Sequence, residues 1–403
     1  MAVGLNPHPT MLPVPGVRLG TAMAGVKKPG HSDLVVMELA PGSRVAAVFT
    51  RNRFCAAPVH VAREHLAAGT PRYLLINTGN ANAGTGERGF RDARACCAAV
   101  ADHTGVSPRA VLPFSTGVIG EPLPSERIRA AVPAAVEALA ADGWAQAAPA
   151  ILTTDTVPKG ASRTVNLEAG PVTLTGMAKG AGMIRPDMAT MLAFIATNAE
   201  LHQEQLDRLL PEVVRTSFNR ITVDGDTSTN DACVLAATGA SGVALRSEAD
   251  LERIRSTLRE LCEELAQAIV RDGEGATRFI TIAVEAARTE SEAEAVAFTI
   301  AQSPLVKTAF FAGDPNWGRI LAAIGRAGVD DMDVDQVAIW LDDLCIAAGG
   351  GRSEDYQETE AAARMGRDEV TVRVTLGRGE AQARVWTCDF SYEYVRINAE
   401  YRT

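Results

Sequence analysis

The sequence has few of the residues that bind metals or form disulfides. It contains seven cysteines, none of them in a CxxC pair, and six histidines, none of which follows His202. An odd number of scattered cysteines without a secretory signal is typical of reduced thiols in a cytoplasm. Neither an HExxH motif nor a Cys/His pair at ligand spacing is present, so no metal site is predicted. The chain also lacks the GxSxG motif that would support a Ser/His system.

Long apolar runs and an excess of positive charge are missing as well. No apolar run approaches the length that spans a bilayer. Residues 1–16 are rich in proline and have neither the basic nor the apolar region of an export signal. The formal net charge of −10 argues against nucleic acid or an anionic membrane as the main partner. We therefore expect a soluble, cytoplasmic protein.

The chain has ample material for a large core. Hydrophobic residues make up 47% of the sequence and charged residues 22%, and the length of 403 residues favours two or three lobes. Periodicity predicts helices over 90–103, 125–141, 203–218, 247–271, 291–302 and 358–365. It predicts strands over 33–39, 44–50, 58–62, 72–77, 111–114, 163–167, 172–177, 190–197, 279–285, 370–375 and 383–388. The turn Ala40–Ser43 is typical of a hairpin between the first two strands.

The stretch 177–199 combines polar and apolar features in an informative order. Lys179 opens a glycine-loosened turn, and Thr190 follows Ala189 directly before an apolar strand. A hydroxyl after a small residue at the mouth of a core strand suits self-cleavage, because it can attack the preceding carbonyl and free a new N-terminus. The amine released has a pKa of about 8 and can act as base for its own side chain. On this stretch alone, an ordinary threonine that begins a strand remains an alternative.

Three further polar segments have both a functional and a structural interpretation. A strand that ends at 115–117 would present backbone N–H groups and a hydroxyl, the donors of an oxyanion hole, although such turns are usually structural. The cluster 153–156 is either a capped turn or a substrate contact. The segment 219–231 alternates like a calcium loop, but Thr229 and Leu235 stand where that loop needs Gly and Glu. A buried hydrogen-bond network under the predicted nucleophile strand is expected there instead.

Seven segments resemble the glutamate N-acetyltransferase / ornithine acetyltransferase family. The two most extensive are KGAGMIRPDMATML at 179–192 and SFNRITVDGDTSTND at 217–231. The others are FSTGVIG at 114–120, TTDTVPK at 153–159, DGEGAT at 272–277, DPNWGR at 314–319 and NAEYRT at 398–403. They occur in order along nearly the whole chain, which makes the resemblance specific.

The resemblance implies how the chain is processed and folded. The bond between Ala189 and Thr190 would be cleaved by the protein itself, giving an α chain, 1–189, and a β chain, 190–403. The two chains would stay associated, and the family implies a heterotetramer with two copies of each. The implied fold is α/β, a layered sheet-and-helix sandwich that resembles the self-processing amidohydrolase-like fold of ornithine acetyltransferases and aminopeptidases.

The resemblance also implies a reaction and its residues. Thr190 would carry the acetyl group from N2-acetylornithine to glutamate in a ping-pong reaction of arginine biosynthesis, and Thr116 and Gly117 would stabilise the oxyanion. The implied substrate contacts are one of Thr153 and Thr154, together with Lys179, Glu274, Asn398 and Thr403. No cofactor is implied, although some family members accept acetyl-CoA as a co-substrate.

Two other functions compete with this one. A self-cleaving aminopeptidase or amidase of the same architecture would pass the acyl group to water, and hydrolysis of neutral peptides requires neither Lys179 nor Glu274. An uncleaved small-molecule-binding protein would keep Thr190 inside the chain and would show no burst of acetylated protein.

Overall fold

The chain forms two compact units in the computed structural model, which describes residues 2–26, 30–185 and 191–400. The larger unit comprises Asn6–Asn219 and Asp226–Ile269, and the smaller one comprises Met1–Leu5, Arg220–Gly225 and Val270–Thr403. Both units therefore contain residues from both sides of the predicted cleavage point.

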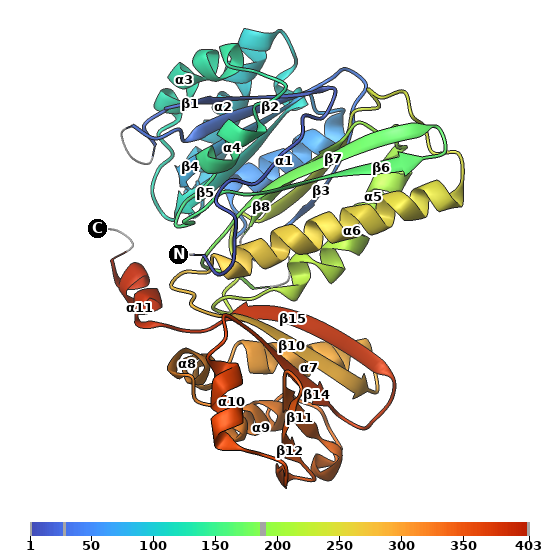
Figure 1. Cartoon of the computed structure of the whole chain (residues 1–403). Helices are drawn as coiled ribbons and strands as arrows, with labels where there is room; N and C mark the ends of the chain where they lie inside the picture. Colours follow the sequence, from blue (N-terminus) through green and yellow to red (C-terminus); the bar gives the residue numbers. More distant parts are fainter. Residues whose placement is uncertain (1, 27–29, 186–190, 401–403) are drawn as a thin grey trace. The chain divides into compact units, whose positions relative to one another are not determined.

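The larger unit contains two sheets (Figure 1). The first has the order β1 (Val17–Ala22), β2 (Leu34–Leu39), β4 (Tyr73–Asn80), β5 (Val111–Val118). The second has the order β3 (Arg44–Phe49), β9 (Ala232–Ala237), β8 (Leu192–Thr197), β7 (Gly170–Lys179), β6 (Lys159–Leu167). Strands β4 and β5 pair in parallel, as do β8 and β9, and the other neighbours are antiparallel.

The two sheets pack face to face around one apolar cluster. Ile76 and Phe114 of the first sheet join Met177 and Phe194 of the second in this cluster. The rings of Phe114 and Phe194 meet edge to face, with their centroids 5.1 Å apart. Every residue of β8 is buried, as expected for a central strand that is covered on both faces.

Helices cover the outer faces of both sheets. The first sheet packs against α2 (Gly86–Thr104) and α3 (Ser125–Glu137) through a second apolar cluster. The second sheet is covered by α5 (Gln203–Thr216) and α6 (Glu248–Arg271). The helix packing is close, because a Cβ on Gly176 of β7 would lie 3.0 Å from Leu261 and Leu265 of α6. The resulting order of layers, helix–sheet–sheet–helix, confirms the predicted α/β layered sandwich.

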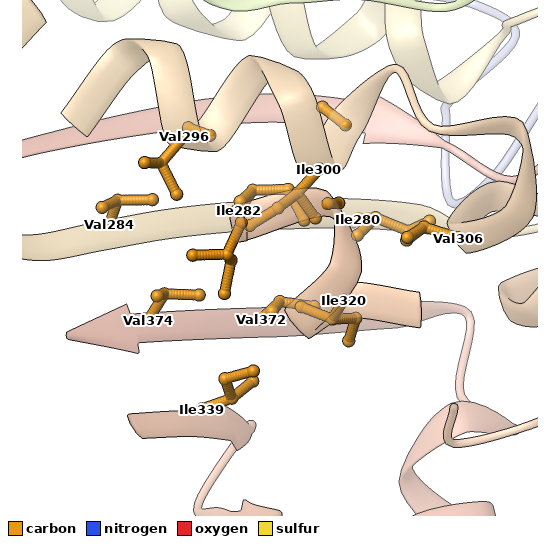
Figure 2. Close-up of a cluster of buried hydrophobic side chains, with 14 of the residues drawn as sticks. Ile280, Ile282, Val284, Val296, Ile300, Val306, Ile320, Ile339, Val372 and Val374 are labelled. Carbon is orange, nitrogen blue, oxygen red and sulfur yellow. The ribbon is translucent and has the colours of Figure 1, made fainter. Parts of the chain in front are cut away.

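The smaller unit is built on one mixed sheet. Its order is β13 (Gly351–Arg352), β12 (Leu344–Ala348), β11 (Ala338–Leu341), β14 (Glu369–Thr375), β10 (Phe279–Ala287), β15 (Ala381–Cys388). Its helices are α7 (Glu290–Ala301), α8 (Pro304–Ala312), α9 (Trp317–Gly325), α10 (Glu358–Met365) and α11 (Tyr392–Ala399). Figure 2 shows Ile280, Ile282 and Val284 of β10 beside Val296 and Ile300 of α7. The period of two in β10 places these aliphatic residues on one face of the sheet.

Most predicted elements are confirmed, but the first hairpin is wrong. Residues 40–43 do form a tight turn, in which Ser43 N donates to Ala40 O at 3.1 Å. However, β2 pairs with β1 and β4, whereas β3 pairs with β9 in the other sheet. Both edges of β2 are occupied, so the turn carries the chain from one sheet to the other.

Two further boundaries need correction. Residues 58–62 belong to helix α1 (Ala57–Ala68) and not to a strand, because Pro58 occupies the first helical turn, where proline is favoured. Strand β5 does not stop at Phe114 but runs to Val118, because its parallel pairing with β4 continues through that segment.

No single helix within residues 2–26, 30–185 and 191–400 is long and apolar enough to cross a membrane. Helices α7 and α8 meet the length and composition requirements only as a pair, which is bent by 57°.

Candidate active site

The two predicted oxyanion residues lie inside strand β5 and not in a turn beyond it. Thr116 and Gly117 stand opposite Thr78 and Gly79 of β4 in the parallel register. Gly117 has a φ of 136°, and a Cβ there would lie 2.2 Å from the carbonyl carbon of Gly79. Only glycine fits this approach of two backbones. Thr116 is buried, whereas Gly117 is half-buried.

Asn230 connects this strand to the loop that precedes β9. Its buried side-chain amide donates to the carbonyl oxygens of Ser115 at 2.9 Å and Ala81 at 2.6 Å. The Ser115 hydroxyl donates in turn to Asn77 Oδ1 at 2.6 Å. These contacts satisfy polar groups that would be costly to bury alone. They confirm the predicted buried network for Ser228–Asp231 but not for the rest of the segment, because Asp226 is exposed and Asp224 belongs to the smaller unit.

The neighbouring residue in the same loop, Asp231, holds the backbone at Met191. Its Oδ1 accepts from Met191 N at 2.9 Å, and Ala232 N donates to Met191 O at 3.1 Å. Within the described part of the chain, Asp231 Oδ2 has no hydrogen-bond partner although it is buried. Burial raises the pKa of Asp231 well above its usual value, against the opposing effects of the Met191 N–H, the Lys179 charge and the Ser228 side chain. A buried carboxyl group therefore anchors the residue that follows the predicted nucleophile.

A second buried carboxylate, Asp155, is fully paired. Its Oδ1 accepts from Lys159 Nζ and from Gly180 N, both at 2.6 Å, and its Oδ2 lies 3.9 Å from Lys179 Nζ. Oδ2 also accepts from Thr153 N at 3.0 Å. Burial alone would raise the pKa of Asp155, but the charges of Lys159 and Lys179 hold it below its usual value. This arrangement joins the 153–159 turn to the end of β7.

The predicted substrate residues of the larger unit thus gather around Asp155. Lys179 is the last residue of β7 and is buried, so its prediction in a loosened turn is wrong, and it is not an ordinary surface lysine. Thr153 contacts Asp155 directly, and Thr154 is half-buried in the same turn. Ala189 and Thr190, the predicted cleavage pair, lie outside the described residues.

Two predicted substrate residues of the smaller unit meet each other. Asn398 Nδ2 donates to Glu274 Oε2 at 2.8 Å, and Glu274 is buried. Asn398 lies on α11, which begins at a serine cap: Ser391 Oγ accepts from Glu393 N and donates to Gly275 O at 2.6 Å. Without the family resemblance the sequence would have predicted a disordered tail here. Thr403 lies outside the described residues.

The sequence did not identify the residues that hold the site together. Asp155, Lys159, Asn230 and Asp231 were visible only as members of polar segments. The one local signal was a lysine four positions after an aspartate in a segment without a helical pattern. Among the residues that the structure describes, no group of three or more His, Cys, Asp or Glu side chains could hold a metal ion.

A strand that contains the predicted oxyanion donors is thus tied to the residue after the predicted nucleophile within a four-layer sandwich, the arrangement that a self-processing acyl-transferring enzyme requires. Residues 18–403 match the ArgJ family. The chain belongs to the ArgJ family, which confirms the resemblance to glutamate N-acetyltransferases / ornithine acetyltransferases.

Two curated relatives are similar over nearly their whole length. The chain is 59% identical to the arginine biosynthesis bifunctional protein ArgJ of Methylococcus capsulatus, over 98% of this chain and 97% of that protein. It is 54% identical to the protein of the same name from Pseudomonas syringae pv. tomato, over 100% of both.

Solved structures of the family are similar over a part of the chain. The arginine biosynthesis bifunctional protein ArgJ of Bacillus halodurans is 39% identical, covers 50% of this chain and 96% of its own, and has a TM-score of 0.48. The ornithine acetyltransferase of Mycobacterium tuberculosis, solved in complex with ornithine, is 36% identical, covers 45% of this chain and 97% of its own, and has a TM-score of 0.41. This protein is therefore an autocatalytically processed acyltransferase of the glutamate N-acetyltransferase / ornithine acetyltransferase type that acts on small molecules.

Proposed function

We propose that this protein moves the acetyl group of N2-acetyl-L-ornithine to L-glutamate through an ester on Thr190, as a step of arginine biosynthesis. The observation that carries the proposal is the Asn230–Asp231 pair. One side chain binds the backbone beside Thr116, and the next binds the N–H of Met191. Two consecutive residues thus support a close link between the proposed oxyanion donors and the residue after the proposed nucleophile.

The chemistry needs two acyl transfers. The α-amine of Thr190 takes the proton of its own hydroxyl, whose oxygen attacks the acetyl carbonyl of N2-acetylornithine. The Thr116 hydroxyl and the Gly117 N–H donate to the tetrahedral oxyanion. The proton then passes to the departing amine, and ornithine leaves. The α-amine of glutamate attacks the acetyl ester and releases N-acetylglutamate, so a covalent intermediate divides one difficult exchange into two easier steps.

The buried charges support recognition of charged amino-acid substrates. Lys159 lies 2.6 Å from Asp155 and Lys179 lies 3.9 Å from it, so Lys159 is its closer counter-ion. We propose that Lys179 directs its charge to a substrate carboxylate, with Thr153 or Thr154 beside it. We further propose that Glu274 receives the ornithine ammonium, and that Asn398 and Thr403 complete the substrate contacts.

The second sheet supports lasting association of the two chains. Strands β8 and β9 follow the predicted cleavage point, and they lie between β3 and β7, which precede it. Cleavage would leave the hydrogen bonds of this sheet in place. We propose that the chains assemble as a heterotetramer in the cytoplasm, where the free cysteines stay reduced.

No resident cofactor is needed for these steps. We propose acetyl-CoA as a second acetyl donor, a proposal supported by the word "bifunctional" in the names of both relatives. Acetyl-CoA would acylate the same hydroxyl, so Thr190 would serve both donors.

The test compares the wild-type protein with Thr190→Ala by intact mass under denaturing conditions and by acetyl transfer. We expect two wild-type chains, one of which begins at Thr190, and a single inactive chain for the variant. Thr197→Val, a change in strand β8 after the predicted cleavage point, is the control and should leave cleavage intact. Cleavage of Thr190→Ala at this bond, or transfer by that variant, would refute the proposal. Release of acetate in place of N-acetylglutamate would indicate the amidase alternative.

A further inference from the structure

Arginines gather without acidic neighbours in the segment that contains strand β3 and the first half of helix α1. Residues 39–63 contain four arginines and no aspartate or glutamate, although the whole chain has a formal net charge of −10. Arg44 donates to Leu201 O at 3.0 Å, and Arg63 donates to Thr50 O at 2.8 Å. Neither arginine forms an ion pair with a residue that the structure describes. A guanidinium group has five N–H donors, so both side chains keep donors for an anion.

These two arginines line one cavity of about 640 Å³ in the larger unit. The cavity lies beside β3, the edge strand of the second sheet, and residues of α1 and α5 complete its lining (Figure 1). Among the described residues of the lining, Asp207 carries the only negative charge, and its Oδ1 accepts from Gln203 Nε2 at 2.9 Å. Much of the wall is apolar and comes from Val45, Ala47, Phe49, Leu66 and Pro71. An apolar wall with few polar groups and a volume of about 300–1,000 Å³ is typical of a small-molecule site.

The cavity lies close to the loop that holds the candidate active site together. Phe49 and Arg63 both line the cavity, and the guanidinium carbon of Arg63 lies 5.4 Å from the centroid of the Phe49 ring. The next residue, Thr50, donates from its backbone nitrogen to Asp231 O at 2.9 Å and from its hydroxyl to Ser228 O at 2.7 Å. Along this path, Thr50 is the single residue between the lining of the cavity and the loop that contains Asp231.

The lining indicates what kind of molecule the cavity would take. Two arginines without carboxylate partners favour a ligand with phosphate or carboxylate groups, and the apolar wall favours a ligand with an apolar body. Glutamate has two carboxylates but no such body, and ornithine adds positive charge. Acetyl-CoA has phosphates and an adenine ring at one end and a long uncharged arm that carries the thioester at the other.

We propose that this cavity binds the phosphorylated nucleotide of acetyl-CoA, an inference that rests on the second acetyl donor proposed above. Arg44 and Arg63 pair with the phosphates, and the apolar wall covers the adenine ring. The uncharged arm extends past Thr50 toward the loop that contains Asp231. The donor therefore has a binding region that N2-acetylornithine does not use.

The first test measures kcat/KM for each donor in Arg44→Gln and Arg63→Gln. We expect the value for acetyl-CoA to fall by about 10-fold or more in each variant, as for the loss of hydrogen bonds to a charged group. The value for N2-acetylornithine should stay at the wild-type level, which also shows that the variants are folded. Arg127→Gln is the matched control: Arg127 also donates to one backbone carbonyl, Gly25 O at 3.0 Å, but lies on α3, away from the lining of the cavity.

The second test changes the charge of the cavity without removing any contact described above. Thr70 is exposed and lines the cavity, so both Thr70→Glu and Thr70→Lys should fold. We expect kcat/KM for acetyl-CoA to fall in the first variant and to rise in the second, by about 2-fold to 5-fold, the range for partly screened charges. Added salt should reduce both differences. A purely structural effect of the substitutions would not give opposite signs.

The third test uses adenosine 3′,5′-bisphosphate, which has the phosphates and the adenine ring but no thioester arm. It should inhibit transfer from acetyl-CoA competitively and weaken in Arg44→Gln, whereas transfer from N2-acetylornithine should continue. Inorganic phosphate at the same concentration separates a nucleotide site from a simple anion site. Equal inhibition by phosphate would overturn the assignment of the cavity to a nucleotide.

The wild-type enzyme separates this inference from the proposed function. If it transfers acetyl groups from N2-acetylornithine but not from acetyl-CoA, the second donor is wrong and the inference fails with it, while the main reaction stands. If it uses both donors, and the variants at Arg44, Arg63 and Thr70 leave kcat/KM for acetyl-CoA unchanged, the inference alone is overturned.

Discussion

The turn 153–159 and the loop 228–231 each contain an aspartate with a fully buried side chain, but the two carboxyl groups differ in their partners and in the direction of their pKa shift. Asp155 meets two lysines and two backbone N–H groups, and its pKa is lowered. Asp231 accepts one backbone N–H on Oδ1 and is also stabilised by the Ser228 side chain and the Lys179 charge, but its Oδ2 has no close partner among the described residues and its pKa is raised.

This difference separates a carboxyl group that is paired with charges from one that has few partners. A carboxylate whose oxygens are all occupied stabilises the fold and is a weak base. A carboxylate kept short of partners makes the fold less stable and retains its affinity for a proton. The predictions that follow test this contrast, and all variants are made in the Thr190→Ala background, which we expect to stay in one uncleaved chain.

Removal of the Asp155 carboxylate should have the largest effect on the free energy of unfolding. Asp155→Asn leaves Lys159 and Lys179 buried without their carboxylate, and breaking a buried pair in this way costs about 3–5 kcal/mol. The measurement is urea unfolding followed by circular dichroism. A loss of less than about 1 kcal/mol would show that the two lysines are compensated elsewhere.

Lys159 and Lys179 should differ in how much they contribute to stability. Lys159→Met removes the 2.6 Å charged hydrogen bond to Asp155 and should cost about 1.5–3 kcal/mol, the range for hydrogen bonds to charged groups. Lys179→Met removes the 3.9 Å contact, so we expect a smaller loss of stability. In the Thr190-containing enzyme, however, Lys179→Met should raise KM for the amino-acid substrates. Equal losses of stability would contradict the assignment of Lys159 as the closer counter-ion.

The smallest effect should be a gain in the free energy of unfolding, caused by Asp231→Asn. The folded-state pKa of Asp231 is raised, so its favourable contribution is fully present below its unfolded value of about 3.9 and is lost as the pH rises through the folded value. Asp231→Asn has no such dependence. Its unfolding free energy should therefore overtake that of the parent as the pH rises from about 4 to about 8.

Asp155 should show the opposite dependence, because its pKa is lowered. Its contribution is present above about pH 3.9 and is lost as the pH falls through the folded value. Unfolding curves at several pH values measure both variants against the parent. A parent that is more stable than Asp231→Asn at every pH would mean that the Asp231 carboxylate stabilises the fold, as that of Asp155 does.

The elements that the sequence predicted best carry a strong local signal. The long helix predicted over 247–271 is observed as Glu248–Arg271, and the strands predicted over 163–167 and 172–177 are observed within β6 and β7, which pair as neighbours. In both, the residues that determine the structure are neighbours along the chain. The turn 40–43 also formed as predicted, but which partner each flanking strand takes depends on the whole sheet.

The site could be predicted only through the resemblance, because its own contacts join distant residues. The bond from Asn230 to Ser115 spans 115 positions, and the bond from Met191 to Asp231 spans 40. Hydrophobic periodicity along the sequence does not indicate such long-range contacts. The sequence shows that polar residues gather at 153–159 and 228–231. It does not show that Asp155 has two lysine counter-ions, whereas Asp231 has no counter-ion at a comparable distance.

The pairing of β7 with β8 has a consequence for the folding of the mature enzyme. These strands, aligned from Leu174↔Thr197 to Lys179↔Leu192, belong to different chains after cleavage. Assembly of the sheet is first order in protein before the cut and second order afterwards, because two separate molecules must then meet. Recovery from denaturation should therefore depend on dilution in the processed enzyme but not in its precursor. After the cut, refolding therefore requires two chains to meet, whereas the precursor can refold as a single molecule.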